Sequence, residues 1–186
     1  SHSFFMEHPQ EFFDFYRKKL LYPDAEPNAC HKALAQLEQQ GRLSAVITQN
    51  IDGLHQKAGS QHVLELHGSV LRNYCMQCHK AYSVETILHT HGIPHCTCGG
   101  RIKPDVVLYE ESLDSSVLEQ AIEAITSADL LIIGGTSLVV YPAAGLIRYF
   151  QGRHIVLINK SGTQADGSAA LLFHESIGKV MGTAVE

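Results

Sequence analysis

The spacing of apolar residues along the chain changes repeatedly between a helical period and short continuous runs. Apolar residues three and four positions apart predict amphipathic helices, whereas short runs rich in Val, Ile and Leu predict buried strands. We expect helices over residues 9–20, 27–41, 84–89, 116–126, 142–150 and 176–185. We expect strands over residues 43–48, 63–66, 105–109, 129–133 and 154–158. Strands that alternate with helices indicate an α/β fold, with a parallel sheet covered by helices on both faces.

Residues 72–104 interrupt this alternation, because they are rich in Cys, His and Gly and contain no long apolar run. Two closely spaced pairs of cysteines lie in this stretch, Cys75 with Cys78 and Cys96 with Cys98. Four thiolates complete the tetrahedral shell that zinc prefers and leave no open position for a substrate. We therefore expect a small inserted zinc-binding module with a structural role.

Two alternatives to a four-cysteine zinc site remain open from the sequence. In the first alternative, the four cysteines are simply reduced, buried thiols. In the second, a nearby histidine replaces one of the cysteines as a zinc ligand. The candidate histidines are His79, His91 and His95. The fifth cysteine, Cys30, lies beside two alanines on an expected helix, where a small core residue is the ordinary interpretation.

Composition narrows the range of functions. The 186 residues are enough for one domain that carries a small insert. The formal net charge is −5 and no long basic run occurs, which argues against nucleic acid as a partner. No apolar run approaches the roughly 18 residues that a membrane span requires. An odd number of cysteines, four of them clustered, favours metal binding in a reducing compartment, so we expect a cytoplasmic protein.

Three of the expected strands end in a cluster of polar residues, at the edge where parallel sheets bind ligands. The clusters follow residues 48, 133 and 158, and their glycines permit close approach of the backbone to a ribose or a phosphate. Taken singly, each cluster is typical of an ordinary loop or turn. Three together favour a dinucleotide ligand, although the chain contains no G-x-G-x-x-G fingerprint.

A histidine, His67, lies between Leu66 and Gly68 just after an expected short strand. An imidazole with a pKa of about 6.5 can act as a general base when it lies in a cleft beside a sugar. The chain has twelve histidines, and most of them must be surface or structural residues. His67 is therefore a candidate base only in combination with the other motifs.

These motifs run through the chain in a characteristic order. They are Thr48-Gln49-Asn50-Ile51-Asp52-Gly53-Leu54-His55, Glu65-Leu66-His67-Gly68, the two cysteine pairs, Lys103-Pro104-Asp105-Val106-Val107, Gly135-Thr136-Ser137-Leu138 and Ile158-Asn159. In this order they resemble the sirtuin family of NAD-dependent protein-lysine deacylases, over about residues 25–160. The resemblance implies a Rossmann-like NAD-binding domain and a smaller zinc-containing domain.

The resemblance also implies a role for each motif. His67 resembles the general base that deprotonates a ribose hydroxyl of NAD, the co-substrate. The residues that resemble cofactor contacts are Gln49, Asn50, Ile51, Asp52, Gly135, Thr136, Ser137 and Asn159. Those that resemble contacts to an acyl-lysine peptide, which pairs as an added strand, are Val106, Val107 and Tyr109. The expected products are nicotinamide, the free lysine and acyl-ADP-ribose, with acetyl as the expected acyl group.

The chain departs from the family pattern in two places. Glu110 stands where the family has a glycine between an aromatic residue and a glutamate, and neither a Gly-Ala-Gly phosphate loop nor the Phe-Arg element that follows it is present. We therefore expect a longer natural protein, and weak NAD binding by a sheet that lacks its first strand. Two alternative functions stay open, mono-ADP-ribosyl transfer to a protein and a catalytically incomplete, zinc-bearing interaction module.

By this interpretation the chain divides into three regions. Residues 1–27 are the remnant of a helical cofactor-loop region of the small domain. Residues 28–71 and 105–186 form the Rossmann-like domain, and residues 72–104 form the zinc-binding module.

Overall fold

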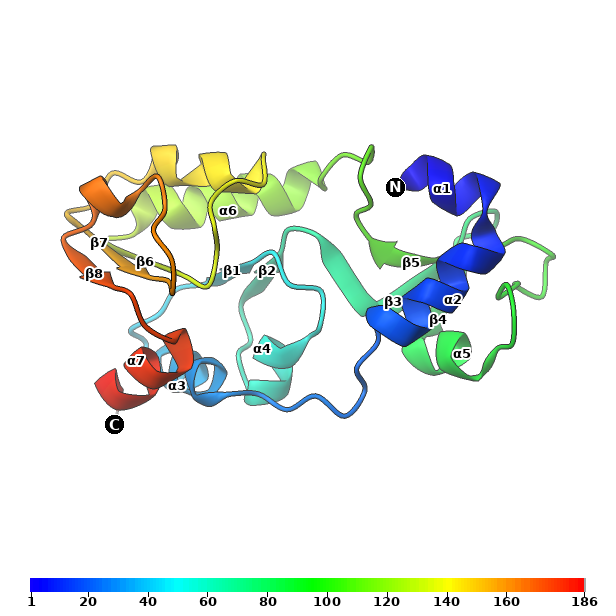
Figure 1. The fold of residues 1–186 in the computed structure, drawn as a ribbon, viewed down its shortest axis with the longest axis horizontal. Helices are drawn as coiled ribbons and strands as arrows, with labels where there is room; N and C mark the ends of the chain where they lie inside the picture. The colour runs from blue at the N-terminus through cyan, green and yellow to red at the C-terminus, as the bar shows by residue number, and fades with distance from the viewer. Residues whose placement is uncertain (186) are drawn as a thin grey trace. The chain divides into compact units, whose positions relative to one another are not determined.

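The structure is a computed structural model that describes residues 1–185. The chain folds into two compact units, and each is built from several stretches of sequence (Figure 1). The cysteine unit comprises Ser1–Ala25, Thr48–Gly53 and Glu65–Leu113. The parallel-sheet unit comprises Glu26–Ile47, Leu54–Leu64 and the chain from Asp114 onward.

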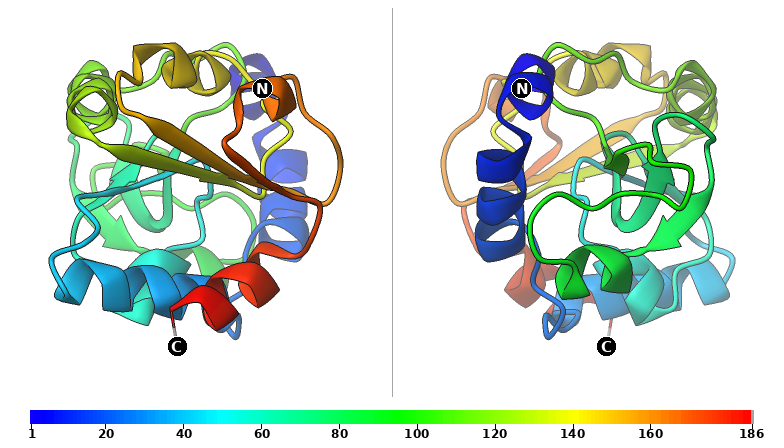
Figure 2. Two further views of the ribbon diagram at one scale, coloured as in Figure 1. Left: turned by 90° about the vertical axis from the view of Figure 1, so that its left-hand side faces the viewer. Right: turned by 90° about the vertical axis from the view of Figure 1, so that its right-hand side faces the viewer.

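A three-stranded parallel sheet forms the centre of the parallel-sheet unit. Its order is β6 (Leu130–Gly134), β7 (His154–Ile158) and β8 (Leu171–Phe173). Helices α3 (Ala29–Gln39) and α7 (Ile177–Ala184) cover one face, and α6 (Ser115–Ser127) and the 3-10 helix η1 (Ala143–Tyr149) cover the other (Figure 2). The expected α/β fold, with a parallel sheet between helices, is confirmed.

Helix α3 shows how local sequence positions an element against this sheet. Asn28 caps the helix, because its side-chain oxygen accepts hydrogen bonds from the backbone N–H groups of Cys30 and His31. Cys30 and Ala33 then face inward and pack with Ile158 of β7. Cys30 is a buried core residue as its position predicted, and burial raises the pKa of its thiol to about 11.

The cysteine unit is built around an antiparallel sheet (Figure 1). Its strands are β4 (Ala81–Ser83), β3 (Gly68–Cys75) and β5 (Ile102–Val106), in that spatial order. The helices of this unit are α1 (His2–Glu7), α2 (Pro9–Lys19) and α5 (Val84–His89). The sheet therefore begins before residue 72 and ends after residue 104, so the cysteines belong to a larger structure than the expected insert.

Aromatic rings from the two N-terminal helices fill the core of the cysteine unit. Phe5, Phe13 and Tyr16 have no exposed surface, and the rings pack edge to face around Phe13. The buried residues that share this core are Phe12, Leu21, Val70, Cys75, Ile87, Cys96, Ile102 and Val106. Two of the four clustered cysteines are thus core residues, and the cysteine cluster is continuous with the hydrophobic core.

Three short elements complete the described chain: β1 (Val46–Thr48) and β2 (Val63–Glu65), which form a two-stranded sheet, and α4 (Leu54–Ala58). A 3-10 turn, η2 (Asp166–Ser168), precedes β8. No helix of residues 1–185 is long and apolar enough to span a membrane.

Several expected elements differ in bounds or type. The strand expected over residues 43–48 is shorter, because β1 begins at Val46. The strand expected over residues 105–109 is wrong in its bounds, because β5 ends at Val106 and Leu108 begins a turn that is closed by the backbone N–H of Glu111. The helix expected over residues 142–150 is the 3-10 helix η1, one residue shorter at each end. The errors in bounds concern the ends of real elements, where hydrogen bonds outside the local pattern decide the boundary.

Candidate active site

His67 is held in one orientation by the loop that follows β1. Its ring Nδ1 lies 3.0 Å from the backbone carbonyl oxygen of Gln49, and the side chain is half-buried. A carbonyl oxygen only accepts hydrogen bonds, so Nδ1 carries the proton in this contact. The second ring nitrogen, Nε2, then keeps its lone pair. In the neutral form of the ring, this contact leaves Nε2 as the nitrogen that can accept a proton.

The loop that contains Gln49 is itself hydrogen-bonded to residues on either side of His67, which lies in the turn between β2 and β3. The backbone carbonyl of Thr48 accepts a hydrogen bond from the N–H of Leu66 at 3.0 Å, and the carbonyl of Ile51 accepts from Val70 at 2.9 Å. The hydroxyl of Thr48 accepts from the N–H of Asn50. Four predicted cofactor contacts, Gln49, Asn50, Ile51 and Asp52, therefore lie in the cysteine unit with His67.

The predicted peptide-binding segment also lies beside His67. The N–H of Val107 donates to the backbone carbonyl of His67 at 3.0 Å, and Val106 is paired with Gly68 between β5 and β3. Val106 points into the core, Val107 is half-buried, and Tyr109 is 79% exposed. Of the three, Val107 and Tyr109 have side-chain surface that a ligand can reach.

The remaining predicted cofactor contacts belong to the parallel-sheet unit. Gly135 follows β6, has a φ of +64°, and donates its N–H to the carbonyl of Ile158 at the end of β7. Asn159 follows β7 and donates its N–H to Phe173 at the end of β8. Gly135, Thr136, Ser137 and Asn159 thus lie at the carboxyl edge of one parallel sheet, as the sequence predicted for two of its three polar clusters. The third cluster, after Thr48, follows β1 of a separate two-stranded sheet.

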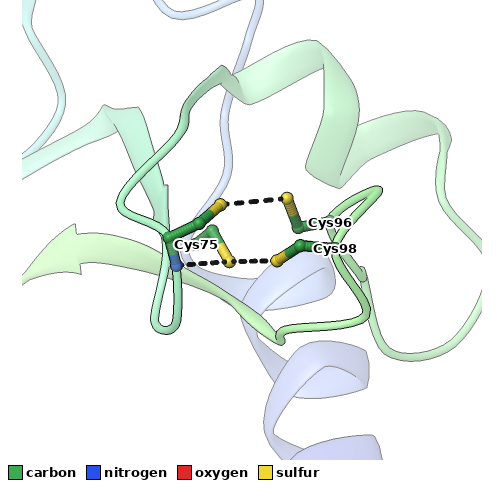
Figure 3. Close-up of side chains that lie close together, drawn as sticks. Cys75, Cys96 and Cys98 are labelled. Atoms are coloured by element: carbon green, nitrogen blue, oxygen red, sulfur yellow. Dashed lines mark hydrogen bonds between the residues drawn. The ribbon is translucent and has the colours of Figure 1, made fainter.

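The four clustered cysteines converge on one point, and Figure 3 shows the side chains of Cys75, Cys96 and Cys98 directed toward one another. The sulfurs of Cys75 and Cys98 are 3.5 Å apart, as are those of Cys78 and Cys96, and all four lie within 4.8 Å of one another. A tetrahedral zinc ion with Zn–S bonds of about 2.3 Å requires sulfurs about 3.8 Å apart. The cluster is consistent with a structural zinc site.

Histidines are absent from this cluster within the described residues, so the alternative in which one replaces a cysteine is not supported. The protein surroundings favour a thiolate at Cys96. A hydrogen bond from the backbone of Cys98 and one from the Tyr82 hydroxyl at 3.0 Å lower the pKa of the Cys96 thiol to about 5. Such stabilised thiolates are the form in which cysteine binds a metal.

Sequence analysis assigned no function to several charged residues in or beside these motifs, yet in the structure each of them has a specific ion-pair partner. Lys103 contacts the carboxylate of Glu111, and Arg72 contacts both Glu65 and Asp105. The sequence could not predict these ion pairs, because the partners are several residues or a whole strand apart along the chain. The only signal was that the residues lie in or beside the motifs.

Comparisons with known proteins agree with this fold. The family model described as the Sir2 family matches residues 1–142. An NAD-dependent protein deacetylase of Clostridium perfringens is 63% identical over 188 residues, which cover all of this chain and 77% of the relative. A solved structure of Sir2Tm bound to a propionylated peptide superposes with a TM-score of 0.91 at 42% identity, over 97% of this chain and 79% of that one.

A further solved structure, of Sir2 with a p53 peptide and NAD+, gives a TM-score of 0.90 at 41% identity, and covers 97% of this chain and 78% of the other. The fold and the cysteine cluster thus define an α/β protein of the sirtuin class. The chain belongs to the Sir2 family. The expected activity is confirmed at that level: the protein is an NAD-dependent protein deacetylase.

Proposed function

We propose that His67 is the general base of this deacetylase. The observation that supports the proposal is the contact between Nδ1 of His67 and the Gln49 carbonyl, which leaves Nε2 as the proton acceptor. In the reaction that the family resemblance implies, that nitrogen removes a proton from a ribose hydroxyl of NAD. In that reaction the acyl oxygen would displace nicotinamide from the ribose, and the deprotonated hydroxyl would attack the resulting alkylamidate. A water molecule would then release the lysine amine, so that the products are nicotinamide, the deacylated lysine and acyl-ADP-ribose.

The residues proposed to bind NAD fall into two groups with different chemistry. Gln49, Asn50 and Asp52 supply amide and carboxylate groups and Ile51 an apolar side chain in the loop that contacts His67, which suits the nicotinamide and its ribose. Gly135, Thr136, Ser137 and Asn159 supply backbone N–H groups, hydroxyls and an amide at the carboxyl edge of the parallel sheet, which suits the phosphates and the adenosine.

The second substrate is proposed to be an acetyl-lysine peptide that binds along the segment of Val106, Val107 and Tyr109, where Val107 and Tyr109 have side-chain surface that it can reach. Val107 is hydrogen-bonded to His67 through the backbone, so a peptide at this segment approaches the proposed base. Similar Sir2 structures contain an acetylated peptide or a propionylated peptide, which supports a peptide ligand with a short acyl chain. The four cysteines are proposed to hold zinc and to stabilise the core of their unit rather than to react.

The decisive experiment measures nicotinamide release that depends on both NAD and an acetyl-lysine peptide. His67→Ala should lower the rate by at least about 100-fold, the scale of a lost general base. His89→Ala, at an exposed histidine on α5, serves as the matched control and should leave the rate unchanged. Wild-type activity in His67→Ala with normal zinc content would refute the proposal.

Mass spectrometry of the products separates deacetylation from the alternative of ADP-ribosyl transfer. Deacetylation yields acetyl-ADP-ribose and a peptide lighter by one acetyl group. Transfer yields a protein that carries ADP-ribose, and that product as the main one would reassign the chemistry of this site.

A further inference from the structure

Arg72 on β3 contacts two carboxylates with two different nitrogen atoms. Its Nη1 lies 2.7 Å from Oε2 of Glu65, and its Nε lies 2.8 Å from Oδ2 of Asp105. The planar guanidinium presents its donors in fixed directions, so one side chain can bridge two acceptors only if both are held in place. Lysine offers a single charged atom and does not reproduce this geometry.

The two carboxylates come from the two segments that meet at the proposed active site. Glu65 ends β2 two residues before His67, and Asp105 lies in β5 two residues before Val107. The backbone hydrogen bond from Val107 to His67 joins the same two segments. Arg72 therefore adds a side-chain bridge next to the backbone contact between the proposed base and the proposed peptide-binding segment.

Burial makes this bridge different from an ordinary surface ion pair. The side chain of Glu65 is only 8% exposed, while that of Arg72 is 44% exposed. Exposed ion pairs contribute little because water screens them, whereas a buried carboxylate depends on its partner. Without Arg72, the carboxylates of Glu65 and Asp105 would lose the cation that they share, and their mutual repulsion would favour separation of the two segments.

We propose that Arg72 is a positioning residue for deacetylation, which fixes the placement of His67 relative to the peptide-binding segment after Val106. This inference rests on the proposed roles of His67 and Val107. A peptide that is misplaced relative to the base should bind more weakly and react more slowly. Loss of Arg72 should therefore change both the peptide KM and kcat, but not the zinc content.

The test compares Arg72→Gln and Arg72→Lys with Lys179→Gln on α7, which removes an exposed ion pair to Glu175. The measurements are kcat, the KM for an acetylated peptide, the KM for NAD, zinc content and melting temperature. Arg72→Gln should lower kcat over peptide KM by about 10-fold to 100-fold, through both constants. In Arg72→Gln the KM for NAD should stay within about twofold of wild type. Arg72→Lys should recover part of the lost activity toward the peptide. Lys179→Gln should match wild type.

A second comparison tests the bridge itself. Asp105→Asn combined with Arg72→Gln should cost less than the sum of the two single losses, because the double variant no longer leaves an unpaired carboxylate at position 105. Additive losses would overturn the proposal. So would an Arg72→Gln enzyme whose only change is a smaller folded fraction, with both KM values and the kcat of the active fraction unchanged.

The outcomes are separable from those of the proposed function. If His67→Ala remains active, the proposed base is wrong whatever Arg72 does. If His67→Ala is inactive while Arg72→Gln has wild-type peptide kinetics, the base stands and the positioning role of Arg72 fails. Should Arg72→Gln not accumulate as folded protein, Arg72→Lys carries the same comparison, and wild-type peptide KM and kcat in it would overturn the proposal.

Discussion

The backbone of Gly68 lies against the backbone carbonyl oxygen of Asp105, with no room for a β-carbon between them. Gly68 also has a φ of +74°, a conformation that other residues adopt only with strain. Because Gly68 directly follows His67, this close contact brings the histidine to the edge of β5. A glycine in the motif is thus required by the packing of two strands.

Gly68→Ala should destabilise the cysteine unit strongly. The added methyl group must push β3 away from β5, and the backbone strain costs a further ~1–2 kcal/mol. Gly41→Ala is the matched control. Gly41 has a similar φ of +70°, but no atom lies within 4 Å of the position that an added β-carbon would take. In this control variant only the backbone strain applies. Chemical denaturation should show a clearly larger loss for Gly68→Ala, together with loss of activity. Equal losses in the two variants would contradict the close contact.

Glu110 should tolerate glycine better than alanine. It is a non-glycine residue with a φ of +79°, and its carboxylate accepts hydrogen bonds from the backbone N–H and hydroxyl of Ser3. Both Glu110→Ala and Glu110→Gly lose these bonds, but glycine also relieves the backbone strain. The melting temperature of Glu110→Gly should therefore exceed that of Glu110→Ala by about 2–4 °C. The reverse order would show that the strained conformation is not retained.

Zinc removal should unfold the core of the cysteine unit. Cys75 and Cys96 are buried together with the aromatic rings of α1 and α2, so loss of the metal leaves thiols without their shared cation inside the core. A strong chelator should lower the melting temperature and abolish deacetylation. If the chelated protein keeps its melting temperature, the cluster is not a structural metal site.

The Tyr82 hydroxyl should strengthen zinc binding through its hydrogen bond to the sulfur of Cys96. Loss of such a partner typically weakens metal affinity by about 10-fold to 100-fold. Tyr82→Phe should therefore release zinc faster to a chromogenic chelator, while Tyr22→Phe, at a 67% exposed position, should behave as wild type. Identical release from both variants would contradict this role.

Glu111 should make the folded state sensitive to acid. Burial raises the pKa of its carboxyl, but the N–H of Leu108, the His2 ring and the Lys103 ammonium lower it, and the net pKa lies below its usual value. A carboxyl with a lowered folded-state pKa contributes stability above its unfolded pKa of about 4.3, and this contribution is lost as the pH falls through the folded value. Unfolding measured from pH 6 to pH 3 should show a shallower loss for Glu111→Gln than for wild type. Parallel curves would contradict the ion pairs.

Local patterns in the sequence were enough for much of the fold. Amphipathic spacing predicted the helices α2, α3 and α6, and apolar runs predicted the strands β6 and β7. These elements could be predicted because their hydrogen bonds or buried faces depend on residues close together in the sequence. The paired spacing of the cysteines likewise predicted a cluster, since two short loops bring each pair together. The order of the motifs identified the family.

Strand β3 was missed because its burial does not alternate along the strand, and its register with β5 shifts between Ser69 and Asn73. The short strand β8 was missed for a different reason, since its three residues are all exposed and carry no buried face. In both cases the pairing partner, rather than the local pattern, defines the strand.

By itself the sequence determined which residues are candidates: the histidine, the polar loops at the strand ends and the four thiols. Only the tertiary structure decided how they are held, through the Gln49 carbonyl behind His67, the Asp105 carbonyl against Gly68 and the guanidinium of Arg72 between two strands. The physical reason is that a residue's chemical type is local, whereas orientation and charge pairing depend on atoms that folding brings together from distant parts of the chain.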